Sequence, residues 1–573
     1  MTRLLAIGLD STDPIWLERW LAAGALPNLA RLREQGVYTR LMNRVVHPGG
    51  KFPSSATEPS WVMFSSGCYP GSTGYWDIVR YDPSTYDYDV EISGRLYDYQ
   101  SCPPFFELGP KYRVSIFDLP VWGPSPRING PQVAGWGGHF TAGISRSEPS
   151  DLLDQLNRDF GRCHVLRNDH GFPWQRSYHD WLERELLASV RKRGSIIRHL
   201  MKREPWDLFI GTFVEGHSAG HDLLHYSDEA HPLFEQRTVN GSPHDPMLRV
   251  YQALDREIGE ILATAPDDTT MVLFAVHGMG ENHSDLLTQA FLPEFLYRWN
   301  FPGKAVLASP PLDKPPGPVI RRPAVGSWVR SLWTTREESN PLKRWLRPYL
   351  PGSWLRTDPG SELASPFSMD LRRLGWMPAA WYRRLWPKMK AFALPTFWEG
   401  RIRINLKDRD GSGNVAPEDY VRVCDELSAS LSKLRDARTG APIVKTVART
   451  RRSPTDADPR LPVADLAVEW VQHAVDAVES PDLGRIGPIP FKRVGGHRPH
   501  GFFLAKGPGI GADTLAEGGE IVDLAPTLLA LLGADIPRRL DGRPLIFPGG
   551  QLDPGGSLET FHSSRDHGLK SVI

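Results

Sequence analysis

The stretch Asp207-Leu-Phe-Ile-Gly-Thr-Phe-Val-Glu-Gly-His-Ser-Ala-Gly-His221 decides the fold that we expect for this chain. Its first half is an apolar run bounded by turn formers, which is typical of a buried strand in a parallel sheet. Its second half places His217 and His221 just beyond the strand, where open α/β sheets bind their ligands. At a spacing of four residues both imidazoles can share one helical face and bind one metal ion. A loop is the alternative, because Gly216 and Gly220 interrupt the segment, and ordinary polar residues after a strand are the alternative to ligands.

Three further segments repeat this arrangement of an apolar run beside a polar side chain. The run Arg3–Leu9 ends at Asp10 and is followed by a helical pattern, and the run from Asp268 delivers His277 into a glycine-rich turn. His497 precedes another apolar run that ends in a turn. The rhythm predicts a doubly wound α/β fold with a mainly parallel sheet, with these side chains at one edge. A helix cap is the alternative role for Asp10.

A run of hydroxyl side chains precedes a short apolar helical segment between Pro53 and Gly74. A hydroxyl at a helix N-terminus can cap that helix, or it can attack a phosphate held by the backbone N–H groups. The residues by themselves favour capping.

Composition excludes several classes of protein. The chain has 573 residues, which exceeds the usual size of one domain, and it carries 67 Lys+Arg against 67 Asp+Glu. Overall charge therefore gives no argument for nucleic-acid binding. The N-terminus lacks the apolar segment of a signal peptide, and no run of about 18 apolar residues occurs, so we expect an unexported, cytoplasmic protein. Four cysteines without a CxxC pair fit that compartment: Cys68, Cys102, Cys163 and Cys424.

The predicted organisation is a catalytic core over residues 1–299 and 396–548, an inserted helical cap over 300–395, and a flexible tail over 549–573. The region 320–390 holds 14 Lys/Arg and 5 Asp/Glu, interleaved with seven tryptophans. One interpretation is a helical subdomain with packed tryptophans and solvated arginines. The functional interpretations are attraction of an anionic phosphate ester by the arginines and contact of the tryptophans with a ring or a membrane surface.

Several motifs resemble the alkaline phosphatase superfamily, most closely the type I phosphodiesterase/nucleotide pyrophosphatase group and the predicted phosphohydrolase/phosphomutase branch. The resemblance covers most of the chain and is carried by Ile7-Gly-Leu-Asp10, Thr57-Glu-Pro-Ser-Trp61 with Thr73-Gly74, His277-Gly-Met-Gly280, Gly496-His497, and Ile521-Val-Asp-Leu-Ala-Pro-Thr527 with Leu540-Asp-Gly-Arg-Pro544. It implies an alkaline phosphatase-like core that hydrolyses phosphate mono- or diesters.

The resemblance also implies roles for single residues. Such proteins hold two metal ions beside a Thr or Ser nucleophile, which places Thr57 at the nucleophile and makes Asp10 a ligand of the ion that activates it. The phosphoryl group would pass through a covalent phospho-threonine. The neighbouring hydroxyls of Ser54, Ser55 and Ser60 are the alternative nucleophiles.

Two departures from the usual motifs change the expected ligand sets. The usual Asp-x-x-x-His reads His217-Ser-Ala-Gly-His221, so the resemblance leaves one site with His217, His221 and His497, a set typical of catalytic zinc with an open position. The usual Asp-His pair reads Val276-His277.

The resemblance leaves the other site with Asp10, His277 and the Thr57 oxygen, and that site is weak, filled only with substrate, or empty. We therefore expect one or two divalent ions, zinc first. In a one-ion version, water attacks directly and Thr57 only orients the substrate.

We expect a small-molecule phosphate ester as the substrate, with contact between the cap and a membrane surface as one functional interpretation. The residues specify neither the alcohol of the ester nor the oligomeric state. Two rival functions stay open. A phosphomutase would return the phosphoryl group to a sugar, and a non-catalytic metal-binding relative would use the degenerate site only for binding.

Overall fold

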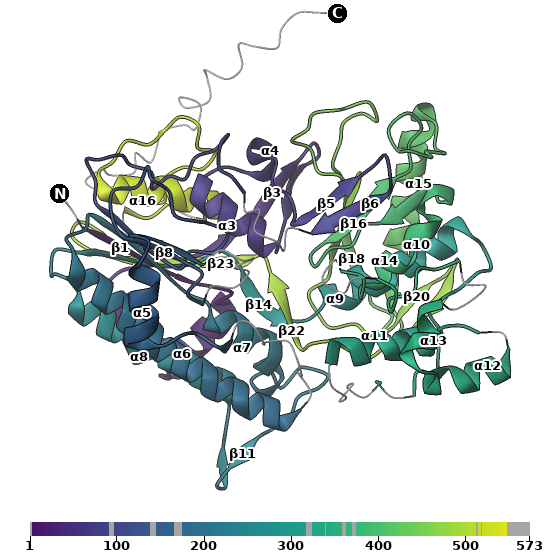
Figure 1. Cartoon of the computed structure of the whole chain (residues 1–573), viewed down its shortest axis with the longest axis horizontal. Helices are drawn as coiled ribbons and strands as arrows, with labels where there is room; N and C mark the ends of the chain where they lie inside the picture. The colour runs from purple at the N-terminus through teal and green to yellow at the C-terminus, as the bar shows by residue number, and fades with distance from the viewer. Residues whose placement is uncertain are drawn as a thin grey trace, which may run out of the picture.

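A computed structural model of the chain forms two lobes that meet along one side (Figure 1). It describes residues 3–90, 97–137, 145–165, 175–313, 315–316, 324–338, 340–357, 362–369, 374–511, 514–516 and 518–546. The predicted tail over 549–573 lies outside the described residues.

The first lobe is built on an eight-stranded sheet within the described residues. Strand β1 pairs in parallel with β10 and β13, while β23 and β9 run antiparallel to their neighbours. This arrangement confirms the predicted α/β fold with a mainly parallel sheet. The strand order is β2 (Val37–Met42), β23 (His500–Lys506), β13 (Thr270–Ala275), β1 (Leu4–Leu9), β10 (Leu208–Phe213), β7 (Val114–Phe117), β8 (Gln132–Ala134) and β9 (Arg146–Glu148).

Helices cover both faces of this sheet because its central strands are apolar on both sides. Leu5 and Ile7 of β1 pack with residues of α6 (Arg176–Arg203) and α8 (Pro246–Thr264). Leu4 packs instead with α3 (Thr57–Ser66) and α16 (Leu524–Leu532). Figure 1 shows α3 and α16 above the sheet and α6 and α8 below it. The doubly wound layering expected from the sequence is therefore present.

The second lobe is an excursion from the core. The chain leaves the core after β14 (Gly278–Glu281) and returns through β22 (Gly495–Arg498), which pairs antiparallel with β14. The Asn282 backbone N–H donates to the Val494 carbonyl oxygen across 2.9 Å, so the excursion begins and ends at one place. The cap predicted over 300–395 lies within it and packs in one apolar cluster with residues from the 402–491 region.

A four-stranded sheet of described residues forms the frame of the second lobe, with two helices packed beside it. The strand order is β15 (Ala391–Ala393), β16 (Gly400–Ile404), β19 (Leu466–Trp470) and β18 (Val444–Arg449), and the helices are α10 (Leu292–Asn300) and α15 (Tyr420–Ser432).

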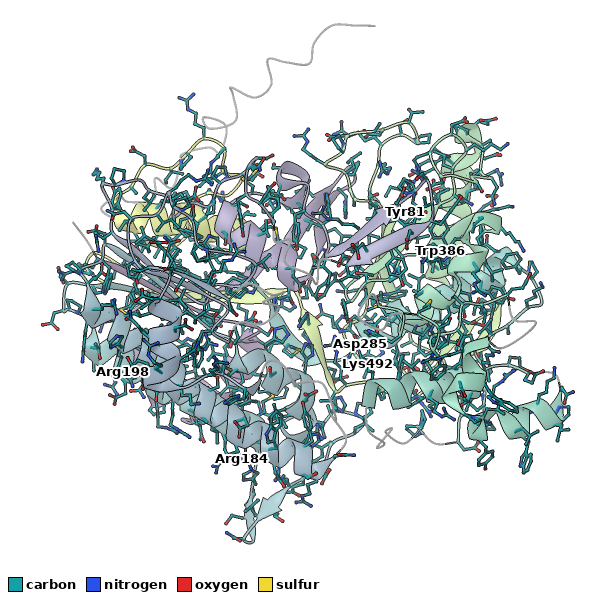
Figure 2. The ribbon with its side chains drawn as sticks, viewed as in Figure 1. Tyr81, Arg184, Arg198, Asp285, Trp386 and Lys492 are labelled. Atoms are coloured by element: carbon teal, nitrogen blue, oxygen red, sulfur yellow. The ribbon has the colours of Figure 1, made fainter. Side chains whose placement is uncertain are left out.

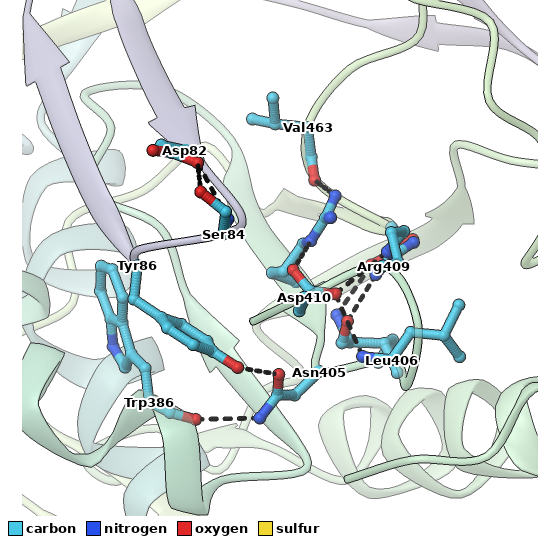
Figure 3. A network of polar contacts seen from close by, with 12 residues as sticks. Asp82, Ser84, Tyr86, Trp386, Asn405, Leu406, Arg409, Asp410 and Val463 are labelled. Atoms are coloured by element: carbon cyan, nitrogen blue, oxygen red, sulfur yellow. Dashed lines mark hydrogen bonds and ion pairs between the residues drawn. The ribbon is translucent and has the colours of Figure 1, made fainter. Parts of the chain in front are cut away.

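A hairpin from the N-terminal part of the chain ties the lobes together. Strands β5 (Val79–Asp82) and β6 (Asp87–Val90) pack into the apolar cluster of the second lobe. Figure 3 shows Tyr86 beside Asn405, and the Tyr86 hydroxyl donates to Asn405 Oδ1 across 2.7 Å. The Asn405 amide in turn donates to the Trp386 carbonyl oxygen across 3.1 Å. Because these polar groups are buried and paired, the hairpin holds one lobe against the other.

The tryptophans of the region 320–390 divide into two sets. Five are buried, which agrees with the interpretation of a packed subdomain: Trp328, Trp333, Trp376, Trp381 and Trp386. Trp345 and Trp354 are exposed at 66% and 67%. Among the described residues, no helix combines the length and apolarity required to cross a bilayer.

Candidate metal centre and active site

The histidine pair of the deciding stretch lies on a helix. Helix α7 (Glu215–Leu223) follows β10 directly, so His217 and His221 stand one turn apart on one helical face, as the four-residue spacing predicts. Both side chains are buried, with exposures of 0% and 1%. The helical alternative is therefore confirmed over the loop.

A buried arginine fixes the first turn of α7. The Arg193 guanidinium, from α6, contacts Glu215 Oε1 at 2.9 Å and Asp118 Oδ2 at 2.8 Å, and all three side chains are almost completely buried. It also donates to the Thr212 carbonyl oxygen of β10 across 2.9 Å. Opposite charges that satisfy each other's hydrogen bonds are stable in such a site, whereas removing one partner would leave an uncompensated buried charge. The network positions the helix that carries both histidines.

Three imidazoles point the same nitrogen at one another. His221 Nε2 lies 3.1 Å from His217 Nε2, and His497 Nε2 lies 3.3 Å from His217 Nε2. Two zinc–nitrogen bonds of tetrahedral geometry place their nitrogens about 3.3 Å apart. These two nitrogen pairs have the spacing expected for ligands of one tetrahedral zinc ion, and the three rings together form a group able to hold a metal ion.

The outer nitrogens of His217 and His221 show which nitrogen of these two rings carries the proton. His217 Nδ1 lies 3.0 Å from Asp10 Oδ2, and His221 Nδ1 lies 2.8 Å from the Gly495 carbonyl oxygen. A carboxylate and a carbonyl only accept, so each Nδ1 is the donor and a neutral ring then presents an Nε2 lone pair. Metal-ligating histidines in proteins are oriented in the same way, because the ring nitrogen that does not face the metal donates a hydrogen bond to an oxygen acceptor.

Glycines let α7 approach the ribbon that carries His497. A Cβ atom on Gly495 would lie 1.9 Å from the Gly220 carbonyl oxygen, and a Cβ on Gly220 would lie 2.5 Å from Met279 Cγ. No larger residue fits at either position without moving backbone or a core side chain. Gly220, one of the glycines that made a loop the alternative in the sequence, instead permits close packing of α7.

Asp10 and His277 form a second cluster that shares His217. His277 Nε2 lies 3.4 Å from Asp10 Oδ1, and the Trp61 indole donates to the same oxygen across 3.1 Å. His277 is fully buried, and burial lowers the pKa of its imidazole. Val276, at the place of the missing carboxylate, is 0% exposed in an apolar cluster. His217 donates its Nδ1–H to Asp10, so this nitrogen has no lone pair for an ion in the second cluster. The second cluster is then left with Asp10 and His277, whereas the three-histidine group has three ring nitrogens.

Ser11 completes this region with strained backbone. Its φ of +57° is uncommon for a residue with a side chain, and such conformations concentrate at functional sites. The conformation places Ser11 Oγ 2.9 Å from His217 Nδ1 and 3.3 Å from His277 Nδ1. Ser11 thus connects the two histidines on the side opposite the three Nε2 atoms.

Thr57 is the first residue of α3 and is 2% exposed. Its Oγ1 lies 3.1 Å from His497 Nδ1, so the hydroxyl is adjacent to the three-histidine group. Ser60 donates its hydroxyl back to the Ala56 carbonyl oxygen, and Ser54 Oγ accepts from the Ala56 N–H across 3.4 Å. Among the hydroxyls considered from the sequence, that of Thr57 contacts a predicted ligand, His497.

Two cationic residues border the centre on the second-lobe side. Arg493 Nη1 lies 3.1 Å from His221 Nε2, and Asp285 holds the guanidinium through contacts of 2.8 and 3.1 Å. Burial raises the pKa of Asp285, but Arg493 and Lys492 outweigh it and lower that pKa to about 2. Lys492 Nζ lies 3.6 Å from the centre of the Trp376 ring, and burial lowers its pKa to about 7. Figure 2 shows Asp285 and Lys492 together between the lobes.

The structure brings the predicted ligands into two groups, and several of their neighbours were not predicted from the sequence. Ser11 directly follows Asp10, and that adjacency was its available signal. Arg493 stands four residues before His497, which was a weak signal, whereas nothing local links it to Asp285. Trp398, which stacks on His497 with ring centroids 5.4 Å apart, comes from the second lobe and gave no signal.

Comparison with known proteins gives the chain its family. Two solved structures of phosphonoacetate hydrolase from Sinorhizobium meliloti 1021, in complex with phosphonoformate and with phosphonoacetate, are 14% and 13% identical to this chain. Each alignment covers 93% of this chain and 95% of that chain, with TM-scores of 0.40 and 0.41. No curated protein matches the chain. A family profile, type I phosphodiesterase / nucleotide pyrophosphatase, matches residues 4–326. The matched residues include the helix with His217 and His221 as well as Asp10, Thr57 and His277, and the chain belongs to the type I phosphodiesterase/nucleotide pyrophosphatase family.

Proposed function

We propose that this protein is a metal-dependent hydrolase of small phosphate esters that uses a zinc-type ion held by His217, His221 and His497. The family supports a phosphodiesterase or pyrophosphatase activity. The observation that carries the proposal is the convergence of three Nε2 atoms, two of them at 3.1 and 3.3 Å from the third. An ion bound there would polarise a phosphoryl oxygen and lower the pKa of a bound water or hydroxyl.

The residues present fit one ion better than two. Three neutral imidazoles suit zinc, and an oxygen beside each Nδ1 orients the ring. Asp10 serves as such a partner for His217, because its Oδ2 faces His217 Nδ1. A second ion would have Asp10 and His277 with few further ligands, so we propose that it binds weakly or only together with substrate.

Thr57 is proposed as the nucleophile. Its Oγ1 would bond to phosphorus while the ester oxygen leaves, and water would then hydrolyse the phospho-threonine. His497 Nδ1 lies 3.1 Å from Thr57 Oγ1, and a neutral His497 that gave its Nε2 lone pair to an ion would donate its Nδ1–H to that oxygen and orient it. Thr57 also begins α3, whose first N–H groups favour an anionic phosphoryl oxygen.

Arg493 is proposed to bind the phosphoryl group of the substrate. Its guanidinium adjoins His221, is largely buried, and is oriented by Asp285. A planar, oriented guanidinium is well suited to bind two oxygens of a phosphate. The positive charges of this border also favour approach of an anionic ester.

Metal analysis tests the centre. Purified wild-type protein loaded with zinc and desalted is expected to retain the ion, and His221→Ala is expected to lose most of it because one of three ligands is gone. His500→Ala, the same change three residues after His497, should keep the ion. Equal metal content in wild type and His221→Ala would reject the three-histidine site.

Thr57 variants separate nucleophilic attack from a supporting role. If Thr57 attacks, Thr57→Val abolishes turnover while the ion stays bound, Thr57→Ser retains activity, and a quenched reaction contains a phosphorylated Thr57 peptide. Ser54→Ala is the matched control. If water attacks instead, Thr57→Val keeps turnover, and its main effect is weaker metal binding through His497.

Product analysis addresses the rival functions. Turnover in ¹⁸O-labelled water is expected to place the label in the released phosphoryl product. Phosphoryl transfer to a second position of the same substrate without label would instead indicate a mutase. A metal-loaded protein that binds phosphate esters and turns over none of a broad ester panel would indicate a non-catalytic relative.

A further inference from the structure

A group of exposed apolar side chains lies at the outer corner of the second lobe. It is carried by α12 (Pro341–Leu346), the short helix η4 (Arg347–Tyr349) and α13 (Gly352–Thr357), which Figure 1 places far from the central sheet. The described chain exposes eleven large apolar side chains, and five of them occur here. We call these five the aromatic corner: Leu342 (63% exposed), Trp345 (66%), Leu346 (41%), Tyr349 (76%) and Trp354 (67%).

The backbone beneath the aromatic corner is anchored, so these side chains are held outward. Leu355, next to Trp354, is 2% exposed in the apolar cluster of the lobe. Arg347 is buried and pairs with Glu338 at 2.5 Å. The chain thus buries neighbouring residues of the same segment while it exposes its largest aromatic rings. Large apolar patches of this kind usually mark interaction surfaces.

The charge of the segment selects the kind of partner. Residues 341–357 contain Lys343, Arg344, Arg347 and Arg356, and they contain no Asp or Glu. Lys343 and Arg344 on α12 and Arg356 on α13 are exposed, so they lie on helices that also carry residues of the aromatic corner. The chain as a whole has no net charge, so this local excess of positive charge stands out from its background.

We propose that the aromatic corner docks the protein on an anionic lipid surface. Trp and Tyr favour the boundary between lipid and water because the apolar ring faces the acyl chains while the N–H or O–H group faces water. Leu342 and Leu346 add apolar area at the boundary with the acyl chains, and the exposed cations attract anionic headgroups. Contact would be peripheral, since no helix among the described residues could cross a bilayer.

Charge complementarity favours lipid over a second copy of the chain. A two-fold interface through the aromatic corner would bring Lys343, Arg344 and Arg356 against the same cations of the partner, since each side presents the same surface. Like charges at an interface oppose association. An anionic bilayer instead supplies the opposite charge over a wide area.

Sedimentation with vesicles tests the proposal. The full-length wild-type protein is expected to sediment with vesicles of phosphatidylcholine mixed with phosphatidylserine, to bind phosphatidylcholine alone less well, and to dissociate as salt rises. Trp345→Ala/Trp354→Ala should weaken binding to the mixed vesicles by about tenfold or more. Lys343→Glu/Arg344→Glu should weaken it similarly and reduce the salt dependence.

Matched controls and solution size complete the experiment. Val421→Ala and Lys407→Glu change exposed residues of the same lobe outside the corner and should leave vesicle binding unchanged. Unchanged melting temperature and unchanged turnover of a soluble ester would show that the corner variants are folded and that the active site is intact. Wild-type protein that ignores the mixed vesicles would overturn the proposal. So would a dimer that the tryptophan variants convert to monomer without any change in vesicle binding.

Discussion

Trp398 of the second lobe lies nearly parallel to His497 of the core, with ring centroids 5.4 Å apart and 21° between the ring planes. The contact joins the second lobe to one of the three imidazoles of the proposed metal centre. Trp398→Ala is expected to lower metal affinity several-fold and to raise KM, because His497 loses the ring that restrains its orientation. Trp398→Phe should retain most of both. Metal competition assays and steady-state kinetics measure the two effects, and identical values for the alanine variant would show that the stacking is incidental.

Substitution of Asp10 tests whether the protein binds one metal ion or two. Asp10→Ala removes the acceptor of His217 Nδ1, so the dissociation constant of the three-histidine ion should rise about tenfold to hundredfold. A direct ligand role at a second ion would instead reduce the number of ions per chain and leave the tight ion unaffected. Titration with a chromophoric chelator reads both quantities. Asp267→Ala, in an exposed turn, is the control.

Val276→Asp restores the carboxylate that the usual family motif carries. The variant is expected to bind metal with a stoichiometry that rises from about one ion per chain toward about two, since an anionic oxygen joins Asp10 and His277. Val276 is fully buried, so the metal-free variant should be less stable than wild type and should regain stability as zinc is added. Val276→Asn has a similar size without the charge and should show neither gain. Flat stoichiometry in a folded Val276→Asp protein would contradict the placement.

Arg493 is expected to act on substrate binding. Arg493→Ala should raise KM for a soluble ester by about tenfold or more, and Arg493→Lys should recover only part of the loss because a lysine cannot bind two oxygens in one plane. Asp285→Asn should resemble Arg493→Lys, since it weakens the group that orients the guanidinium. Arg435→Ala, on an exposed position of the same lobe, is the control. Unchanged KM in Arg493→Ala would leave the residue with a structural role.

His47 should make the protein sensitive to acid. It stacks on Trp76 with ring centroids 5.2 Å apart, and burial lowers the pKa of its imidazole to about 4 despite the nearby Glu399. Between the usual pKa of about 6.5 and this value, the unfolded state binds a proton that the folded state does not, so stability falls as pH drops through that window, by up to about 3 kcal/mol. His47→Phe should flatten this dependence in urea melts, whereas His473→Phe, on a partly exposed residue, should not.

Local patterns predicted the fold and most of the candidate centre. Apolar runs followed by polar residues predicted β1, β10 and β13. A parallel strand that is buried on both faces has consecutive apolar residues, so its pattern is local. The spacing of His217 and His221 predicted a shared face because helical periodicity is equally local.

Contacts between distant segments could not be predicted in the same way. Arg493 and Asp285 are brought together by the return of the chain through β22, and Trp398 reaches His497 only through the packing of the second lobe. The choice of Nδ1 or Nε2 on each histidine depends on such tertiary partners. The exposure of single tryptophans could not be predicted either. Trp345 is exposed and Trp381 is buried, yet both have arginine-rich surroundings in the sequence.

The hydrogen bond between Asn282 and Val494 closes the base of the long excursion between β14 and β22. An insertion at this single point adds the excursion without rethreading the central sheet, and the β5–β6 hairpin packs against the inserted part. The excursion can therefore be exchanged during evolution as one unit. The half that supplies His217 and His221 can stay unchanged through such an exchange.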